Sequence, residues 1–372
     1  MPVRFIIALV AVFILACSPE KKILKSFQLG HYQTVIDHYL KVLEKDPENA
    51  KANFFVAESY RHSNRIKNAG PYYEKVSGSG FNPDSVRFFY AEALRANGDY
   101  SGAEEALTKL INESKITALR DYARRQLEGI QSLESIAKKQ NYYKVKNLEA
   151  INTQHAEFSP VYLNGELYFT SSRSSASIYL ATGTPYTDLY KVTTKGAVVS
   201  PETVKALPVE INDELRNEGC VTFSPDGKTM VFARGNSKKK KGGGVDVDLY
   251  VARYRNNVWT APVPININTQ FRDESGNDAK NFSWDSTPSF SPDGRSLYFS
   301  SNRKGGFGGN DIYVAQVDSR GRFGKVRNLG AEINTPGDDM FPYLAENGKL
   351  YFASDGHPGF GKIGRASCRE RV

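Results

Sequence analysis

The most constraining feature of this 372-residue chain is a short pattern that recurs along its second half. In its fullest form, over residues 289–315, Ser-Phe-Ser-Pro-Asp-Gly is followed by Leu-Tyr-Phe-Ser-Ser-Asn-Arg and then by Gly-Gly-Asn-Asp-Ile-Tyr. Proline presets φ, aspartate bonds its own backbone and glycine supplies a positive φ, so the middle of the pattern predicts a tight turn between two strands. The motif residues expected to have a structural role in the repeats are Pro160, Pro225, Asp226, Gly227, Pro292, Asp293 and Gly294.

Related segments begin at Phe158, Phe223 and Phe341, and each runs into a second apolar stretch. An aspartate opens the expected third strand in three repeats, where capping of the backbone is the simplest role: Asp188, Asp248 and Asp311. A lead-in, Ile-Asn-Thr or Ile-Asn-Asp, recurs at residues 151, 211, 267 and 333, at spacings of 60, 56 and 66 residues. Tandem units of about 50 residues with three or four strands each predict the blades of a β-propeller.

The propeller region is expected to span residues 142–361, with complete repeats at 155–213, 217–268 and 285–334. The fourth repeat stops after its second strand. Because propellers usually need four to eight blades to close, we expect an incomplete ring. Residues 143–148 resemble an outer strand of a later repeat, so we expect them to complete the last blade as a clasp.

A second period, of 34 residues, runs through the first third of the chain. It relates Gly30, Asn64 and Gly98, and with them Tyr32, Ile66 and Tyr100. This spacing and these residue types resemble tetratricopeptide repeats over residues 18–111, in which helical hairpins stack into a solenoid. Residues 112–141 are expected to form a linker with an amphipathic capping helix. The predicted fold class is therefore an α-solenoid followed by an all-β propeller.

The N-terminus has the pattern of a secretory signal. Arg4 precedes twelve apolar residues, 5–16, which are too few to span a bilayer. The following Cys17 resembles the acylated cysteine of a bacterial lipoprotein, so residues 1–17 are expected to be a lipoprotein signal peptide. Acyl chains on Cys17 would anchor the protein to a membrane.

Residues 362–372 abandon the repeat pattern and resemble a translated sequencing adapter. This tail and Arg4 supply much of the net charge of +8, so binding of nucleic acid is not expected. If Cys17 is a lipid site and Cys368 belongs to the tail, Cys220 remains alone and no disulfide framework exists.

The order of signal peptide, helical repeats and Ser-Pro-Asp-Gly blades is similar to that of envelope lipoproteins grouped with the OmpA family, which include a component of type IX secretion. The blades themselves resemble the WD40-like repeats of TolB-type propellers. The resemblance implies a protein anchored in the outer membrane and facing the periplasm. Binding to peptidoglycan would require a further C-terminal domain, which these 372 residues do not show.

No pattern of catalytic or metal-binding residues stands out. None of the five histidines pairs with cysteine or carboxylate at metal-ligand spacing, and no Gly-x-Ser-x-Gly nucleophile elbow occurs. We therefore expect no catalytic residue, no metal and no cofactor. Cys220 is expected to pack as a small apolar group.

Binding of a protein partner is the better expectation for the helical region. In the 34-residue register, the first helices would present an exposed phenylalanine pair beside repeated charges, which suits a peptide or a partner helix. A solvated helix face is the plainer alternative. The groove residues predicted in this way are Lys51, Phe54, Glu58, Arg61, Phe88, Glu92 and Arg95.

These features predict a non-enzymatic scaffold that docks envelope proteins through its groove and its propeller. Two alternatives stay open: a propeller-based enzyme such as a glycan lyase or peptidase, and a glycan-binding propeller without catalysis. Fold alone does not choose among them, because function depends on the sites that a fold carries.

Overall fold

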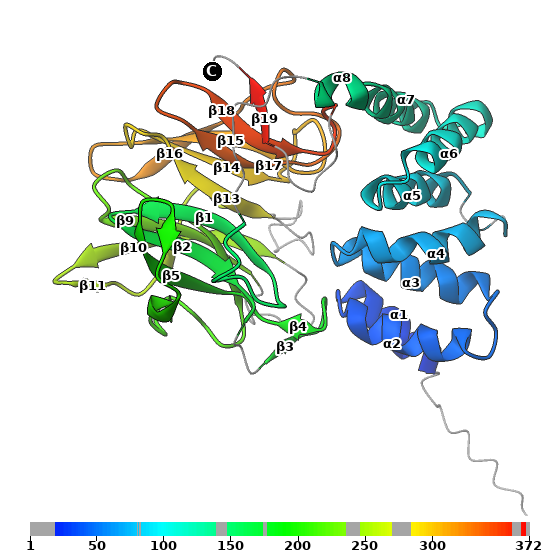
Figure 1. Ribbon diagram of the computed structural model, residues 1–372, viewed down its shortest axis with the longest axis horizontal. Helices are drawn as coiled ribbons and strands as arrows, with labels where there is room; N and C mark the ends of the chain where they lie inside the picture. The colour runs from blue at the N-terminus through cyan, green and yellow to red at the C-terminus, as the bar shows by residue number, and fades with distance from the viewer. Residues whose placement is uncertain are drawn as a thin grey trace, which may run out of the picture.

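The computed structural model describes residues 19–79, 81, 83–138, 147–173, 177–235, 246–269, 284–358 and 366–369. A stack of helices is followed by curled antiparallel sheets in a propeller-like arrangement, and the stack lies beside one end of the sheets (Figure 1). The coarse fold predicted from the sequence, α-helical and then propeller-like β, is confirmed. Cys17 and most of the predicted clasp lie outside the described residues.

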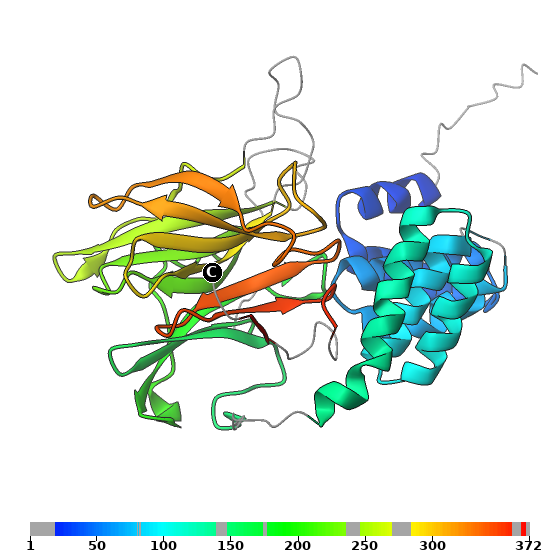
Figure 2. The ribbon, with the colours of Figure 1, turned by 90° about the horizontal axis from the view of Figure 1, so that it is seen from above.

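Within these ranges the helices pack in sequence order, each against the next (Figure 1). Figure 2 shows from above that the stack lies beside the sheets. They are α1 (Pro19–Gln28), α2 (Tyr32–Leu43), α3 (Ala50–His62), α4 (Ile66–Ser77), α5 (Pro83–Ala96), α6 (Tyr100–Glu113), α7 (Thr117–Gln131) and α8 (Leu133–Ala137). The predicted capping helix is interrupted at Ser132, whose hydroxyl donates to the carbonyl of Gly129.

The three turns that the 34-residue period relates share one backbone conformation. Gly30, Asn64 and Gly98 all have positive φ, at 75°, 57° and 84°. This left-handed conformation ends one helix and redirects the chain into the next. Small side chains such as Ala57 and Ala103 are fully buried where the helices cross.

Four antiparallel sheets follow, and we number them 1 to 4 along the chain. Sheet 1 holds β1 (Glu157–Leu163), β2 (Glu166–Ser171), β5 (Asp188–Lys195), β6 (Val198–Val199) and β7 (Lys205–Ala206). Sheet 2 holds β8 (Asn217–Phe223), β9 (Thr229–Gly235), β10 (Val247–Arg255), β11 (Val258–Trp259) and β12 (Val263–Pro264). Sheet 3 holds β13 (Asp285–Phe290), β14 (Ser296–Ser301), β15 (Asp311–Val317) and β16 (Phe323–Asn328), and sheet 4 holds β17 (Asp339–Leu344), β18 (Leu350–Ser354) and β19 (Ala366–Arg369).

Two shorter elements complete the fold. The hairpin of β3 (Ile178–Tyr179) and β4 (Thr184–Pro185) connects β2 to β5, and a 3-10 helix, η1 (Pro201–Thr203), precedes β7. The strand β19 comes from the segment that resembles an adapter tail, and it pairs with the free side of β18.

In the turns between the first two strands of sheets 2 and 3, the glycine and the aspartate act as the motif predicts. Gly227 and Gly294 have φ of 68° and 69°. Asp226 accepts a hydrogen bond from the Lys228 N–H at 3.0 Å, and Asp293 accepts one from the Arg295 N–H at the same distance. The two turns therefore orient their strands in the same way.

The first strands of the four sheets lie side by side and share a β-bulge. At the bulge a residue other than glycine takes a positive φ: Ser159, Cys220, Thr287 and Phe341. Consecutive bulges contact one another, since the Ser159 hydroxyl lies 3.3 Å from the Cys220 thiol and the Phe341 N–H donates to the Thr287 hydroxyl at 3.2 Å. The bulges thus join neighbouring sheets near their common centre.

Candidate functional site

The end of the sheets that lies nearest the helices carries a row of polar residues in every sheet. In sheet 1, Glu157 pairs with Ser171, which pairs with Asp188. The same register places Glu218, Arg234 and Asp248 across sheet 2, and Asp285, Ser301 and Asp311 across sheet 3. Asp339 and Ser354 begin the row in sheet 4. We call these the carboxylate rows.

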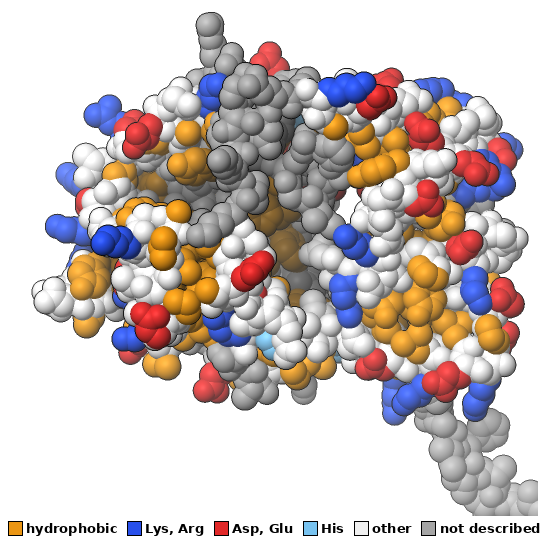
Figure 3. All heavy atoms as spheres, viewed as in Figure 1, with side chains coloured by type: hydrophobic (Ala, Val, Ile, Leu, Met, Phe, Trp, Pro, Cys, Tyr) orange, Lys and Arg blue, Asp and Glu red, His pale blue; other side chains and the backbone are white. Residues whose placement is uncertain are grey.

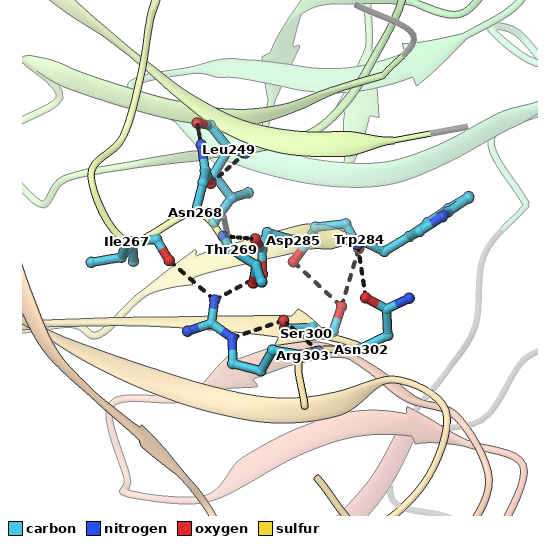
Figure 4. A network of polar contacts seen from close by, with 11 residues as sticks. Leu249, Ile267, Asn268, Thr269, Trp284, Asp285, Ser300, Asn302 and Arg303 are labelled. Carbon is cyan, nitrogen blue, oxygen red and sulfur yellow. Dashed lines mark hydrogen bonds and ion pairs between the residues drawn. The ribbon is translucent and has the colours of Figure 1, made fainter. Parts of the chain in front are cut away.

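Figure 4 shows Asp285, the first residue of the row in sheet 3, together with Arg303 and the lead-in that precedes the sheet. The Arg303 guanidinium donates to the Asp285 carboxylate at 2.8 Å and to the Ile267 carbonyl at 3.1 Å. The Thr269 N–H donates to the same carboxylate at 2.5 Å. Asp285 is fully buried, so these donors replace the water that the carboxylate loses.

The lead-in asparagine links each sheet to the one before it. Asn268 bonds both the N–H and the carbonyl of Leu249 in β10, each at 2.9 Å. Asn212 and Asn334 make the same pair of bonds to Leu189 and Ile312. This geometry explains why Ile-Asn-Thr recurs: asparagine holds the preceding sheet, and the next residue holds the following carboxylate.

The arginine is repeated in the first three sheets. Arg173 contacts Glu157 at 3.2 Å, and Arg234 contacts Glu218 at 2.6 Å. Each arginine also lies over two aromatic rings, as Arg303 does over Phe299 and Tyr313 at 4.9 Å. Ion pairing, hydrogen bonding and cation–π contact together hold a charged group inside the fold.

Sheet 4 departs from this pattern. Where the other sheets place an arginine on the isoleucine carbonyl, the His357 imidazole Nε2 contacts the Ile333 carbonyl at 2.8 Å. The Asp339 carboxylate accepts from the Thr335 N–H at 2.6 Å, and burial raises its pKa. Among the described residues, the acid in the row of sheet 4 therefore lacks the arginine partner that the acids of the other three sheets have.

The aspartates on the third strands are in two environments. Asp311 accepts from the backbone N–H groups of Phe307 and Gly308, at 2.6 and 3.2 Å, which is the capping role expected of it. Burial raises the pKa of Asp188 to about 6. Burial, with the nearby charges of Asp246 and Asp285, raises the pKa of Asp248 to about 6 as well.

These two aspartates lie at the junctions between sheets. The Glu218 N–H donates to the Thr187 carbonyl at 2.8 Å, so Asp188 lies near Glu218. Val247 forms a β-bridge with Trp284, so Asp248 lies near Asp285. Each junction therefore brings two carboxylates together. Across the ranges that the structure describes, no group of three histidine, cysteine or acidic side chains has the arrangement to hold a metal ion. No described helix is long and apolar enough to cross a membrane.

The helical stack touches the sheets at this same end, in two places. At the first, the Gln33 N–H donates to the Leu180 carbonyl of the β3–β4 hairpin at 3.0 Å. Arg65 donates to the Gln33 side chain at 2.7 Å and reaches the Ala181 carbonyl. The absence of a side chain at Gly183 lets Gln33 lie against the hairpin.

The second contact joins α7 to the loops of sheet 4. The Gln126 side-chain amide donates to the Asp355 carbonyl at 3.0 Å and also accepts from Arg95. A methyl group on Gly337 would lie 3.0 Å from the Tyr122 hydroxyl and closer still to Asp355. The surface is hollowed between the helices and the sheets, as Figure 3 shows.

The predicted groove residues are placed differently from the expectation. Phe88 is 5% exposed, so it is not half of an exposed phenylalanine pair; Phe54 is half-buried and packs against Phe81. Arg95 is buried and bonds Glu92 and Gln126, which corrects its expected exposure. Lys51 is exposed and pairs with Glu20.

Glu58 is also buried. It accepts hydrogen bonds from Arg61 and from the Tyr73 hydroxyl, the latter at 2.5 Å. Arg61 lies 4.0 Å from the centre of the Phe89 ring. The repeated ion pairs, Glu58 with Arg61 and Glu92 with Arg95, each lie within one helix. Tyr73, Phe89 and Gln126 contact them from other helices, so these charges are part of the packing inside the stack.

Cys220 packs against the apolar cluster between sheets 2 and 3, as expected of a small apolar group. It occupies the bulge of β8, beside the Ser159 hydroxyl, and burial raises the pKa of its thiol to about 11. A thiol with a raised pKa is a poor nucleophile at neutral pH. Among the described contacts, no histidine side chain bonds a serine or cysteine side chain.

The inner carboxylates, and the pairing of arginines with them, were missed by the sequence reasoning. Their signal is present: an acid follows the lead-in isoleucine by six or seven residues in three repeats, as at Glu157, Glu218 and Asp339. The insertion between Ile267 and Asp285 hides the same relation in the third repeat. Only the arginine of the Ser-Ser-x-Arg pattern was visible beforehand.

Comparison with known proteins finds likeness at the level of solved structures. No family model matches, and no curated protein matches. A puromycin-hydrolysing peptidase of Mycobacterium tuberculosis matches with a TM-score of 0.32 and 16% identity, over 53% of this chain and 27% of that one. A puromycin hydrolase matches with a TM-score of 0.34 and 14% identity, over 60% and 40%. The tricorn protease matches with a TM-score of 0.27 and 12% identity, over 55% and 22%.

The expectation of a non-enzymatic scaffold is corrected by these matches. The structures that the chain resembles include peptidases, so the predictions that it performs no chemistry and is not an enzyme are wrong on this comparison. The chain spans less than half the length of the structures named, and at these TM-scores the matches assign no substrate or residue role to it.

Proposed function

We propose that this chain is the substrate-binding part of a propeller-based enzyme that acts on polypeptides, and that its carboxylate rows bind basic side chains of the substrate. One observation carries the proposal. Two sheet junctions, Asp188 with Glu218 and Asp248 with Asp285, each gather two carboxylates at the end of the sheets beside the helices.

The charge balance of these junctions favours a cationic ligand. Arg173, Arg234 and Arg303 pair with the inner carboxylates, although burial still raises the pKa of Glu218 to about 8, and Asp188 and Asp248 add negative charge beyond these pairs. Their raised pKa values show that the folded protein holds this charge at a cost. A lysine or arginine side chain would remove part of that cost, because charges interact strongly where water is partly excluded.

The helices restrict what reaches the rows. They meet the sheets at the β3–β4 hairpin and at the loops of sheet 4, so a ligand must approach between these contacts. An extended polypeptide carries side chains at regular intervals, so in this proposal it places one basic side chain on each junction. Among the described residues, no histidine side chain bonds a serine or cysteine side chain. In this proposal, the groups that cleave the bond lie outside the described residues.

Peptide binding tests the proposal directly. A fluorescently labelled lysine-rich peptide is expected to bind at pH 7.5, and a matched glutamate-rich peptide is not. The double variant Asp188→Asn, Asp248→Asn should bind the basic peptide at least about tenfold more weakly, since two charge contacts are lost. The control is Asp226→Asn, in the turn at the other end of β8.

The pH dependence has a defined sign. With pKa values of about 6, Asp188 and Asp248 are charged at pH 7.5 and protonated at pH 5, so affinity for the basic peptide should fall over this interval. Equal binding of the basic and acidic peptides, or a double variant that binds like the control, would sink the proposal.

We also propose that α1 to α6 are tetratricopeptide repeats, and the left-handed turns at Gly30, Asn64 and Gly98 support this. That this stack binds an envelope protein stays a prediction, and the exposed residues of the stack would form the contact surface. We propose in addition, from the signal pattern alone, that Cys17 is acylated and holds the protein on the periplasmic face of the outer membrane. Mass spectrometry of the membrane-extracted protein, with Cys17→Ser as control, measures the acyl chains.

A further inference from the structure

A hollow of about 1060 Å³ lies at the end of sheet 3 opposite its carboxylate row. Its lining comes from the turn before β14, the end of β15 and the start of β16, with Asn266 from just before the lead-in. A hollow of this size can hold a small organic molecule. Much of the lining is polar or charged: Asp293, Arg295, Gln316, Asp318, Arg322 and Lys325.

The two acids of this hollow are held by their own turns. Asp293 accepts a hydrogen bond from the Arg295 N–H at 3.0 Å. Asp318 accepts from the backbone N–H and the guanidinium of Arg322, at 2.9 and 2.7 Å. Among the described residues, neither Arg295 nor Lys325 has an ion-pair partner for its side chain. The hollow therefore has a surplus of positive charge.

The equivalent position in sheet 2 lacks this surplus. The strands β10 and β15 align through Tyr250 and Tyr313, each of which pairs with a phenylalanine of the second strand. Two of the differences add a cation to sheet 3, and one removes a side chain, at Gly324, where a methyl group would meet nothing within 4 Å. The three differences are Arg322 for Val258, Gly324 for Thr260 and Lys325 for Ala261.

The strand that carries Lys325 is held in place. Lys325 lies at a β-bulge with φ of 47°, a left-handed conformation that is costly for a residue with a side chain. The Asn266 side chain donates to the Phe323 carbonyl at 2.9 Å. Arg253 of sheet 2 donates to the Gly321 carbonyl at 3.0 Å. These contacts fix β16 and its turn, so the backbone that carries the cations is set before a ligand arrives.

We propose that this hollow binds a soluble small molecule with a phosphate group, through Arg295, Arg322 and Lys325. A phosphate dianion accepts hydrogen bonds from several cations at once, and arginine can donate two to it in one plane. Val317 and Phe323 add apolar lining for the rest of the molecule. The inference goes beyond the proposed function and does not depend on it, because the carboxylate rows lie at the other end of the sheets.

Isothermal titration calorimetry of the full chain with phenyl phosphate, at pH 7.5 and constant ionic strength, tests the proposal. The wild-type chain should bind it with a Kd of about 1 mM or tighter, and should bind benzoate, a carboxylate control, at least about tenfold more weakly. The double variant Arg295→Gln, Lys325→Gln should bind phenyl phosphate at least about tenfold more weakly, since two charged donors are lost. The control Lys228→Gln, Arg255→Gln removes the same charge from exposed positions of sheet 2 and should bind like wild type.

Gly324→Thr distinguishes binding in the hollow from general attraction to a charged surface. It keeps every charge and gives sheet 3 the residue that sheet 2 has, so it should weaken binding at least about fivefold. Circular dichroism confirms that each variant is folded. Vesicles that contain phosphatidic acid test for a lipid headgroup instead of a soluble ligand, and wild type should sediment with them no more than the double variant does.

Four results would each overturn the proposal. They are no binding of phenyl phosphate at about 10 mM, benzoate that binds as tightly, a double variant or Gly324→Thr that binds like the control, and sedimentation with the vesicles that the double variant loses.

Discussion

At the scale of single residues, Glu58 shows how a charge expected on the surface becomes part of the core. Burial disfavours its charged form, but hydrogen bonds from His62, Arg61 and Tyr73 outweigh that effect, and its pKa is lowered to about 2. A carboxyl whose folded pKa lies below its ordinary value of 4.5 stabilises the fold only while it is ionised.

Glu58→Gln is therefore expected to destabilise the helical stack by about 3 kcal/mol at pH 7, the free energy that a shift of this size represents. The contribution is fully present above pH 4.5 and is lost as the pH falls toward 2, so the difference from wild type should shrink over that interval. Urea unfolding followed by circular dichroism at several pH values measures it. Glu105→Gln, at an exposed position on α6, is the control, and an equal effect there would contradict the assignment.

At the scale of elements, the carboxylate rows explain how each sheet is joined to its lead-in. Arg303 bonds Asp285, the Ile267 carbonyl and the Ser301 hydroxyl, and so ties the lead-in to the first and second strands of sheet 3. The arrangement is costly to break, because a buried carboxylate would be left without its partner.

Arg303→Met is expected to destabilise the sheets by about 3–5 kcal/mol in chemical unfolding at pH 7. The double variant Arg303→Met, Asp285→Asn should recover part of this loss, since no unpaired charge remains. Arg322→Met removes a solvent-exposed pair with Asp318 and should change little. If the double variant is no more stable than Arg303→Met alone, the loss of stability in Arg303→Met does not come from the unpaired charge of Asp285.

At the scale of the whole molecule, the relative placement of helices and sheets depends on few residues. Gly337 lies where the loops of sheet 4 meet α7, and an added methyl group would lie 2.1 Å from the Asp355 carboxylate and 2.9 Å from the Gly356 nitrogen. No side chain fits there without shifting the neighbouring loop at Asp355 and Gly356, whose Asp355 carbonyl is bonded by Gln126 of α7.

Gly337→Ala should therefore loosen the helical stack from the sheets while leaving the core of the sheets intact. Hydrogen exchange is expected to rise in the loops of sheet 4 and at the neighbouring surface of α7, and to stay unchanged in β9 and β14. Gly324→Ala, on β16, adds its methyl group to open space and is the matched control. Unchanged exchange in both variants would show that this contact does not position the stack.

The sequence by itself determined the local features: strands that repeat with turn residues such as Gly227 and Gly294, and a 34-residue helical period marked by Gly30, Asn64 and Gly98. These follow from backbone preferences that act within a few residues. The tertiary structure alone decided which charges are buried and which carboxylates meet. Glu58 and Arg95 lie in the core, and Asp188 and Asp248 lie beside carboxylates of the next sheet. Burial and electrostatic interaction depend on segments far apart in the chain, so no local pattern specifies them.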